Sequence, residues 1–278
     1  MTASFRQLHW REYAIEGWAL GCFMLSACTF GALLFHPASP VNGIVSSPLA
    51  QRAAMGTLMG LTLVALVYSP WGRRSGAQMN PAFTLTFLRL GKISPADATG
   101  YVAAQFVGGA LGVWLAARLI GMTIAHPSVN YVVTQPGHAG LTGAFLGELV
   151  ISALQMCLVL AVAGSVRWAR FTGVCAALAV ATYITFESPI SGMSMNPARS
   201  VASAVIAGEW VAIWIYFAAP FLGMGFAAWV YTRVRAVDAV PCGKMMHATP
   251  CIFCDYVRQR GRAGAVQSAP DTALDRTA

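Results

Sequence analysis

Long apolar stretches constrain this chain more than any other feature. Each is close to the ~20 residues that a helix needs to cross a bilayer. They cover residues 13–35, 53–71, 96–120, 141–166, 171–186 and 211–234. Only 10% of the 278 residues are charged, against about 25% in typical soluble domains. The sequence therefore predicts an all-α, multi-pass integral membrane protein.

The basic residues fall in alternate loops between the predicted spans. The net charge is +8, yet segments 36–51 and 121–140 contain neither lysine nor arginine. Cytoplasmic loops of membrane proteins carry an excess of basic residues. We therefore predict that both termini face the cytoplasm, in a plasma or bacterial inner membrane, and the charge requires no nucleic-acid partner.

The first apolar stretch has a second interpretation. Leu25-Ser26-Ala27-Cys28 resembles a lipoprotein cleavage site at the end of a secretory signal. However, apolar residues continue to Phe35, and Glu16 would lie inside the hydrophobic part of the signal. We therefore interpret the stretch as a transmembrane helix.

A three-residue motif occurs twice, as Asn80-Pro81-Ala82 and as Asn196-Pro197-Ala198. Proline suits the first position of a helix, and the preceding asparagine can cap the free N–H groups. The apolar segment 81–90 would rise only ~15 Å at ~1.5 Å per residue, against a hydrocarbon core of ~30 Å. Each motif therefore predicts a half-helix that ends near the middle of the membrane.

The chain divides into two similar halves, at about residues 11–120 and 141–235. The first span of each half contains one glutamate, Glu16 or Glu148, and the motif lies between the second and third spans. Three spans per half is an odd number, so the halves must lie in opposite orientations, as in many transport proteins. A glutamate inside a span needs hydrogen-bond donors. We expect each glutamate to hold the loop before a half-helix; the alternative is a side chain that snorkels near a span end.

The residues around both motifs resemble the signatures of the aquaporin, or major intrinsic protein, family. These residues are Ser75-Gly76-Ala77-Gln78-Met79-Asn80-Pro81-Ala82 and Met195-Asn196-Pro197-Ala198-Arg199-Ser200. The resemblance implies an inverted repeat of six transmembrane helices plus two re-entrant half-helices, within a channel domain at residues 1–235. It also implies a homotetramer that has no enzymatic activity and requires no cofactor.

The resemblance assigns a conduction mechanism to the two motifs. Each half-helix presents roughly half a positive charge at its N-terminus, which repels cations. The amides of Asn80 and Asn196 can donate hydrogen bonds to a passing water and interrupt its proton wire, the argument already used for aquaporin-type pores. The predicted function is a passive channel for water that excludes protons and ions.

The outer filter is less typical of a water channel. By resemblance its residues are Arg199, Ile184, Met193 and either Gly60 or, if Pro70 shifts the register, Met59. Water-selective members usually have an aromatic residue and a histidine at the second-span and fifth-span positions, and this chain has neither. The filter therefore leaves open small neutral solutes such as glycerol, urea, ammonia or a metalloid hydroxide.

Other residues favour the water-channel branch of the family. These are Ser200, Ala204, Tyr216 and Phe217. The rival hypothesis is a proton-coupled secondary transporter, because transporters also contain inverted repeats and Glu16, Glu148 or Glu187 would carry the proton. The paired half-helices favour the channel.

Two residues near the predicted pore have no assigned role. Gln78 stands where many members have histidine, and Glu187 lies close to Ile184 at the predicted outer mouth. We interpret Glu187 as a solvated carboxylate at a helix end; the alternative is a group that titrates and biases the vestibule towards cations.

The cytoplasmic tail, residues 236–278, contains a potential metal site. Cys242, His247, Cys251 and Cys254 form the pattern C-x4-H-x3-C-x2-C, a full tetrahedral ligand set for zinc on the reducing side of the membrane. Free or redox-active thiols are the alternative. We expect an ordered stub followed by disorder.

Overall fold

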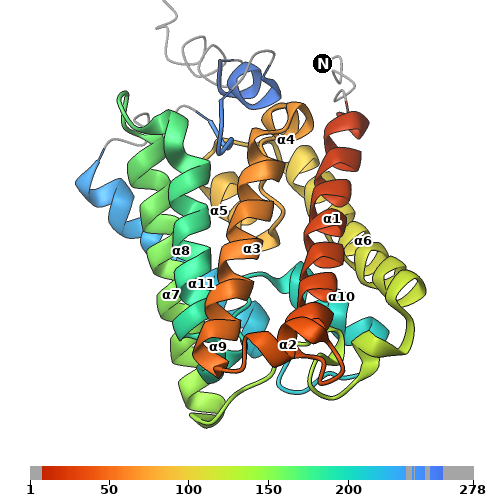
Figure 1. Cartoon of the computed structure of the whole chain (residues 1–278). Coiled ribbons are helices and arrows are strands. Elements are labelled where there is room, and N and C mark those ends of the chain that lie inside the picture. The colour runs from red at the N-terminus through yellow and green to blue at the C-terminus, as the bar shows by residue number, and fades with distance from the viewer. Residues whose placement is uncertain (1–7, 236–239, 241, 248–250, 259–278) are drawn as a thin grey trace, which may run out of the picture.

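The computed structural model describes residues 8–235, 240, 242–247 and 251–258. Within these residues all regular structure is helical, and six helices are long and apolar enough to cross a membrane. These helices are α1 (Trp10–Phe35), α3 (Pro48–Tyr68), α6 (Pro95–Ile120), α7 (Gly140–Ala163), α8 (Thr172–Phe186) and α11 (Ile215–Val234) (Figure 1). The third and fifth spans also include the adjoining 3-10 turns and run over Pro95–Ala125 and Ala169–Phe186. The predicted six-helix membrane fold is therefore confirmed.

Two half-helices lie inside this bundle. They are α5 (Pro81–Arg89) and α10 (Pro197–Ala207), and both begin at the repeated motif. The connections contain α2 (Pro40–Ile44), α4 (Pro70–Ser75), α9 (Ser188–Ser191) and the 3-10 turns η1 (Gly121–Ala125), η2 (Asn130–Val132) and η3 (Ala169–Phe171). A short helical stretch at residues 252–258 follows in the tail.

The long helices pair in the pattern of an inverted repeat. In the first half α1 packs against α6, in the second half α7 packs against α11, and α3 and α8 pair between the halves. Glycines allow the backbones of α1 and α6 to touch. A Cβ atom on Gly108 would lie 2.0 Å from the carbonyl oxygen of Gly17, and one on Gly112 would lie 2.2 Å from that of Gly21. Small residues are the usual means of close helix packing in lipid.

We expect Gly108→Val to separate α1 from α6. The new side chain would overlap the backbone of Gly17, and overpacking of this kind costs about 1–3 kcal/mol or more. The unfolding temperature of the purified protein in detergent should fall, with a lower folded yield. Gly43→Ala is the matched control, because no atom lies within 4 Å of the added Cβ. Equal unfolding temperatures for both variants would contradict this packing.

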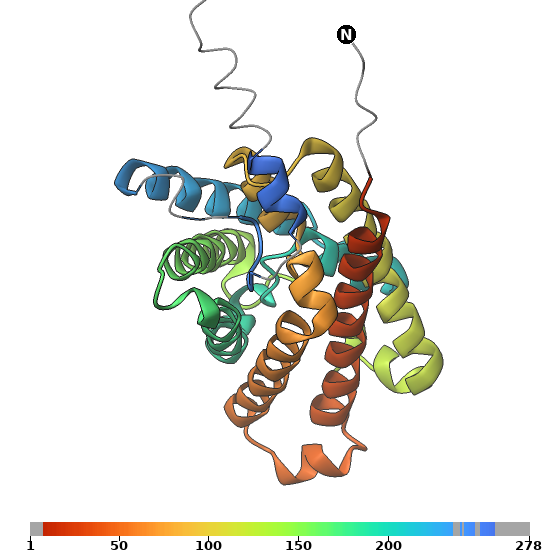
Figure 2. The ribbon, with the colours of Figure 1, turned by 90° about the horizontal axis from the view of Figure 1, so that it is seen from above.

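Both described ends of the chain lie at the same end of the bundle. The start of α1 and the stretch 252–258 are close to α4 (Figure 1), and the tail lies over this end when it is seen from above (Figure 2). Two basic residues lie towards the opposite end of the bundle. Arg52 is near the start of α3, and Arg118 is in the last turn of α6. The disorder predicted for the far tail concerns residues 259–278, which lie outside the described residues.

Candidate functional site

The two asparagines of the repeated motif cap the half-helices. The Oδ1 atom of Asn80 accepts a hydrogen bond from the backbone N–H of Ala82 at 2.8 Å. Asn196 Oδ1 accepts from the N–H groups of Ala198 at 3.1 Å and Arg199 at 3.3 Å. A proline occupies the first turn of each half-helix, where its missing N–H is no loss. Both helix starts are therefore fixed by the motif itself.

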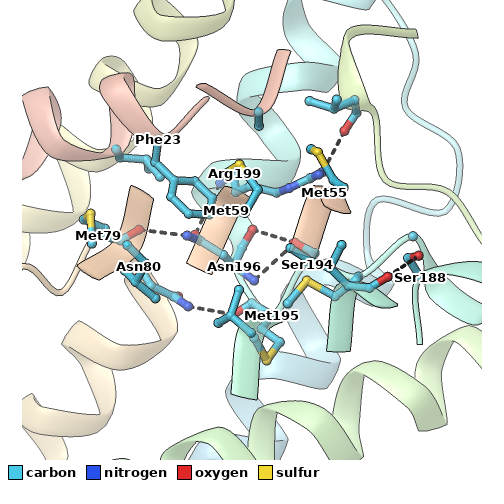
Figure 3. Close-up of a pocket in the computed structure, with 18 of the residues that line it drawn as sticks. Phe23, Met55, Met59, Met79, Asn80, Ser188, Ser194, Met195, Asn196 and Arg199 are labelled. Carbon is cyan, nitrogen blue, oxygen red and sulfur yellow. Dashed lines mark hydrogen bonds between the residues drawn. The ribbon is translucent and has the colours of Figure 1, made fainter. Parts of the chain in front are cut away.

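The same asparagines tie the two halves of the chain together. The Nδ2 group of Asn80 donates to the carbonyl oxygen of Met195 at 2.7 Å, and that of Asn196 donates to the carbonyl oxygen of Met79 at 2.7 Å (Figure 3). Each Nδ2 has a second hydrogen that these bonds do not use. The positive ends of both half-helices consequently meet at one place.

Glu148 and Glu16 hold the loops that lead to these helix starts. Both glutamates are fully buried. Glu148 accepts hydrogen bonds from the Oγ of Ser191 at 2.8 Å and from the N–H groups of Ser194 at 2.6 Å and Met195 at 2.7 Å. Each carboxylate thus replaces the water that would otherwise solvate the loop backbone.

Glu16 makes the corresponding bonds in the first half. It accepts from the Oγ of Ser75 at 2.7 Å and from the N–H groups of Gln78 at 3.1 Å and Met79 at 2.6 Å. A fourth donor, the Nε2 of Gln105, lies at 3.0 Å. The structure therefore places both glutamates where loop support was expected, well inside the bundle.

The loops that the glutamates hold have a strained backbone. In the first half Ala77 and Met79 have φ values of 50° and 49°, and in the second half Met193 and Met195 have φ values of 52° and 54°. This left-handed region costs a residue other than glycine of order 1–3 kcal/mol and persists only where the surroundings enforce it. The hydrogen bonds to the two glutamates provide that enforcement.

One tyrosine completes each support, a role that sequence reasoning missed. The hydroxyl of Tyr101 donates to the carbonyl oxygen of Ser75 at 2.7 Å, and that of Tyr216 donates to the carbonyl oxygen of Ser191 at 2.6 Å. The separations along the chain are 26 and 25 residues. An alignment of the two halves on their motifs would have revealed this near-equal spacing.

One cavity of about 260 Å³ passes the meeting point of the half-helices. Asn80, Asn196 and Arg199 line it, and its wall is otherwise mainly apolar (Figure 3). Methionines form a large part of this wall: Met55, Met59, Met79, Met193, Met195 and Met245. A path lined by a few side-chain amides, the guanidiniums of Arg52 and Arg199 and an otherwise mainly apolar wall suits uncharged molecules.

The predicted filter residues lie in this wall with one exception. Arg199 lines the cavity, and its Nη1 donates to the carbonyl oxygen of Val132 at 2.8 Å. Ile184 and Met193 also line it. Of the two second-span candidates, Met59 lines the cavity, whereas a Cβ on Gly60 would face the carbonyl oxygen of Ala177 on α8 at 3.1 Å.

The chain breaks at Pro70, between the second span and the first motif. α3 ends at Tyr68, Ser69 caps the new helix α4, and its Oγ accepts from the N–H of Gly72 at 2.9 Å. This added turn separates the second span from the motif.

Gln78 connects the first half-helix to the tail. Its Oε1 accepts from the Oγ1 of Thr84 at 2.7 Å, and its Nε2 donates to the carbonyl oxygen of Gly243 at 2.8 Å. Gln78 also lines the cavity. A side-chain amide serves here because the position requires an acceptor for α5 and a donor for the tail at the same time.

Glu187 is not the solvated carboxylate that we expected. It directly follows the span of α8, its side chain is only 8% exposed, and its carboxylate lies towards α7 at Gly147. Neither oxygen has a hydrogen-bond partner among the described residues. Burial, with a contribution from the charge of Glu148, raises the pKa of Glu187 to about 8.

This shift predicts that the protein becomes less stable as the pH rises. Unfolding returns Glu187 to its ordinary pKa of 4.5, so between that value and about 8 the unfolded state binds fewer protons than the native state. The unfolding temperature in detergent should fall as the pH rises through this window. Glu187→Gln should remove that part of the slope and leave water permeability unchanged, because Glu187 does not point into the cavity. An unchanged slope in the variant would exclude this account.

The cysteines and histidine of the tail come together as the sequence pattern predicted. The ligand atoms of Cys242, His247, Cys251 and Cys254 all lie within 4.8 Å of one another. His247 Nε2 is 3.1 Å from the Sγ of Cys254. A hydrogen bond from Cys242 lowers the pKa of the Cys251 thiol to about 5. Cys242 and Cys251 are buried, whereas His247 is exposed.

Comparisons with known proteins agree with this geometry. The model of the family described as "Major intrinsic protein" matches residues 6–231. "Aquaporin NIP1-1" of Zea mays is 31% identical over 77% of this chain and 72% of its own length. "Aquaporin NIP1-3" of Oryza sativa subsp. japonica is 34% identical over 64% of this chain, which spans 61% of that relative.

A solved structure has the same fold. The X-ray structure of the aquaglyceroporin from Plasmodium falciparum superposes with a TM-score of 0.65, over 82% of this chain and 98% of that one. The sequence identity is 18%, so this likeness concerns the fold alone.

Proposed function

Because this chain belongs to the major intrinsic protein family, whose members are passive membrane channels and not enzymes, we propose that it conducts water and small neutral solutes. One observation carries the proposal: the half-helices α5 and α10 begin side by side in one cavity, joined by reciprocal hydrogen bonds from Asn80 and Asn196. Their dipoles oppose the entry of cations. The spare N–H of each amide is available to orient a passing water molecule.

The filter supports solutes beyond water. Met59, Ile184 and Met193 offer no strong hydrogen-bonding groups from their side chains, so Arg199 is the main side-chain donor at this constriction. Glycerol has a hydrocarbon side and a hydroxyl side and can face both. Urea can accept hydrogen bonds from Arg199 through its carbonyl oxygen. Ammonia and uncharged metalloid hydroxides fit the same chemistry.

Stopped-flow measurements on proteoliposomes test this function. We expect water flux above that of bare vesicles, with a low activation energy and no dependence on a proton gradient. Glycerol, urea and ammonia should be measured on the same preparation, because their ratios to water define the selectivity. Flux that requires a proton gradient would support the rival transporter, and flux equal to that of bare lipid would refute the channel.

We propose a homotetramer in the plasma or inner membrane, with both termini in the cytoplasm. Both described ends lie at one end of the bundle (Figure 1), which supports termini on the same side of the membrane, and the basic loops favour the cytoplasm. Apolar side chains such as Leu61 and Leu178 on α3 and α8 are more than half exposed and offer surfaces for neighbouring subunits or lipid. Native mass spectrometry and labelling of intact cells test the two statements.

We propose that transport requires no cofactor and that the tail cluster binds one zinc ion. Three thiols and an imidazole within 4.8 Å of one another form a ligand set that zinc prefers. The metal content of the purified full-length chain tests this proposal.

A further inference from the structure

Residues 240, 242–247 and 251–254, here called the tail segment, lie at one mouth of the cavity. Met245 lines the same cavity as Asn80 and Arg199. The backbone N–H of Met245 donates to the carbonyl oxygen of Gly76 at 3.2 Å. With the bond from Gln78 to Gly243, these contacts place the tail segment in the path that a solute would follow out of the pore.

The tail segment is seated tightly against the bundle. Its residues Val240, Cys242, Lys244, Met245, Cys251 and Phe253 are each 5% exposed or less. The ring of Phe253 meets that of Tyr101 edge to face, with centroids 5.8 Å apart. Lys244 Nζ donates to the carbonyl oxygen of Arg73 at 3.0 Å. This burial shows that the tail segment packs closely against the bundle. In this position we call it the plug.

The four metal ligands join the two parts of this plug. Cys242 and His247 come from its first part, Cys251 and Cys254 from its second. A segment of this length has too little apolar surface to fold on its own, and small units of this kind usually depend on a metal or disulfide. The exposure of His247 gives an ion access from the solution.

We propose that a zinc ion bound by Cys242, His247, Cys251 and Cys254 holds the tail segment in the pore mouth and closes the channel, and that loss of the ion opens it. This inference rests on the channel function and zinc site proposed above. Each thiol that binds as a thiolate gives its proton to water, and no electron is transferred. Zinc availability would then set the permeability of the membrane.

Gln78 is the contact that passes the state of the tail to the pore. In the closed arrangement it bonds both Thr84 on α5 and Gly243 in the plug. Departure of the plug removes Met245 from the cavity wall and frees the Nε2 group of Gln78. That group then faces the solutes as a hydrogen-bond donor.

The test uses the full-length protein in proteoliposomes, either loaded with zinc or treated with a membrane-permeant zinc chelator. We expect one zinc ion per loaded chain and a water permeability several-fold lower than after chelation. Cys242, only 2% exposed when the plug is seated, should resist a maleimide reagent in the loaded form and react after chelation. This labelling reports zinc binding and seating of the plug together, independently of transport.

The variant Cys251→Ser/Cys254→Ser should bind no zinc and remain permeable under both conditions. Cys157→Ser, on the exposed side of α7, is the matched control and should respond like the wild type. Zinc-loaded wild type as permeable as the chelated form would overturn the gate while leaving the channel. A chain that binds no zinc would also overturn it. Flux equal to that of bare vesicles in every form would overturn the channel function itself.

Discussion

Glu148→Leu is expected to abolish water conduction and to lower the stability of the folded protein severely. The change leaves the Ser191 hydroxyl and the N–H groups of Ser194 and Met195 buried without an acceptor. Each such loss costs about 1–3 kcal/mol, and a typical protein is stable by only about 5–15 kcal/mol. Stopped-flow permeability and the unfolding temperature in detergent measure both effects.

Three further variants separate loop support from a general effect of burial. Glu16→Leu should be equally harmful, because four donors lose their acceptor. Glu148→Gln keeps the shape and should be intermediate, since one acceptor oxygen remains. Glu187→Gln removes another buried carboxylate, one without partners among the described residues, and should not destabilise. A Glu148→Leu protein that conducts normally would show that the carboxylate does not shape the pore.

Arg199→Val is expected to make the channel permeable to protons or small cations. The guanidinium lies in the cavity wall, so a cation that passes at ~4 Å meets a repulsion of about 4 kcal/mol at an effective dielectric constant of ~20. That energy corresponds to roughly a thousandfold in rate. The dipoles at Asn80 and Asn196 keep their own barrier, so the expected rise in leak is about tenfold to a thousandfold. A pH-sensitive dye inside proteoliposomes measures it.

Water permeability of Arg199→Val should change much less than its ion leak, because water carries no net charge. Arg199→Lys is the control that keeps the charge and loses only the planar donor set. It should remain tight to protons. If the proton leak of Arg199→Val equalled that of the wild type, the half-helices alone would account for the exclusion of protons and cations.

The fold could be predicted from the sequence because its main determinants are local. Apolar runs of span length and Pro81 or Pro197 directly after a capping asparagine define the helices without knowledge of their neighbours. The odd number of spans per half then requires inversion. The family resemblance adds the arrangement around a pore, which periodicity alone does not provide.

The remaining features depend on contacts between distant parts of the chain. The reciprocal bonds from Asn80 and Asn196 join residues 115 and 117 positions apart. Met59 rather than Gly60 lines the cavity because Gly60 packs against Ala177 of α8. Glu187 was misjudged because its place at a helix end suggested solvent, whereas α7 covers it at Gly147. None of these facts is written in a short stretch of sequence.

The methionines that line the cavity affect how the pore selects solutes by size. Methionine is unbranched, has three rotatable bonds and carries a polarizable sulfur, so it fills irregular space and yields readily. Because Met59 and Met193 line the cavity, its width there can vary more than it would between rigid aromatic rings. Selection of solutes by size then depends on how often the methionine side chains move out of the path. Warming should reduce this size selectivity by a larger factor than it increases water permeability.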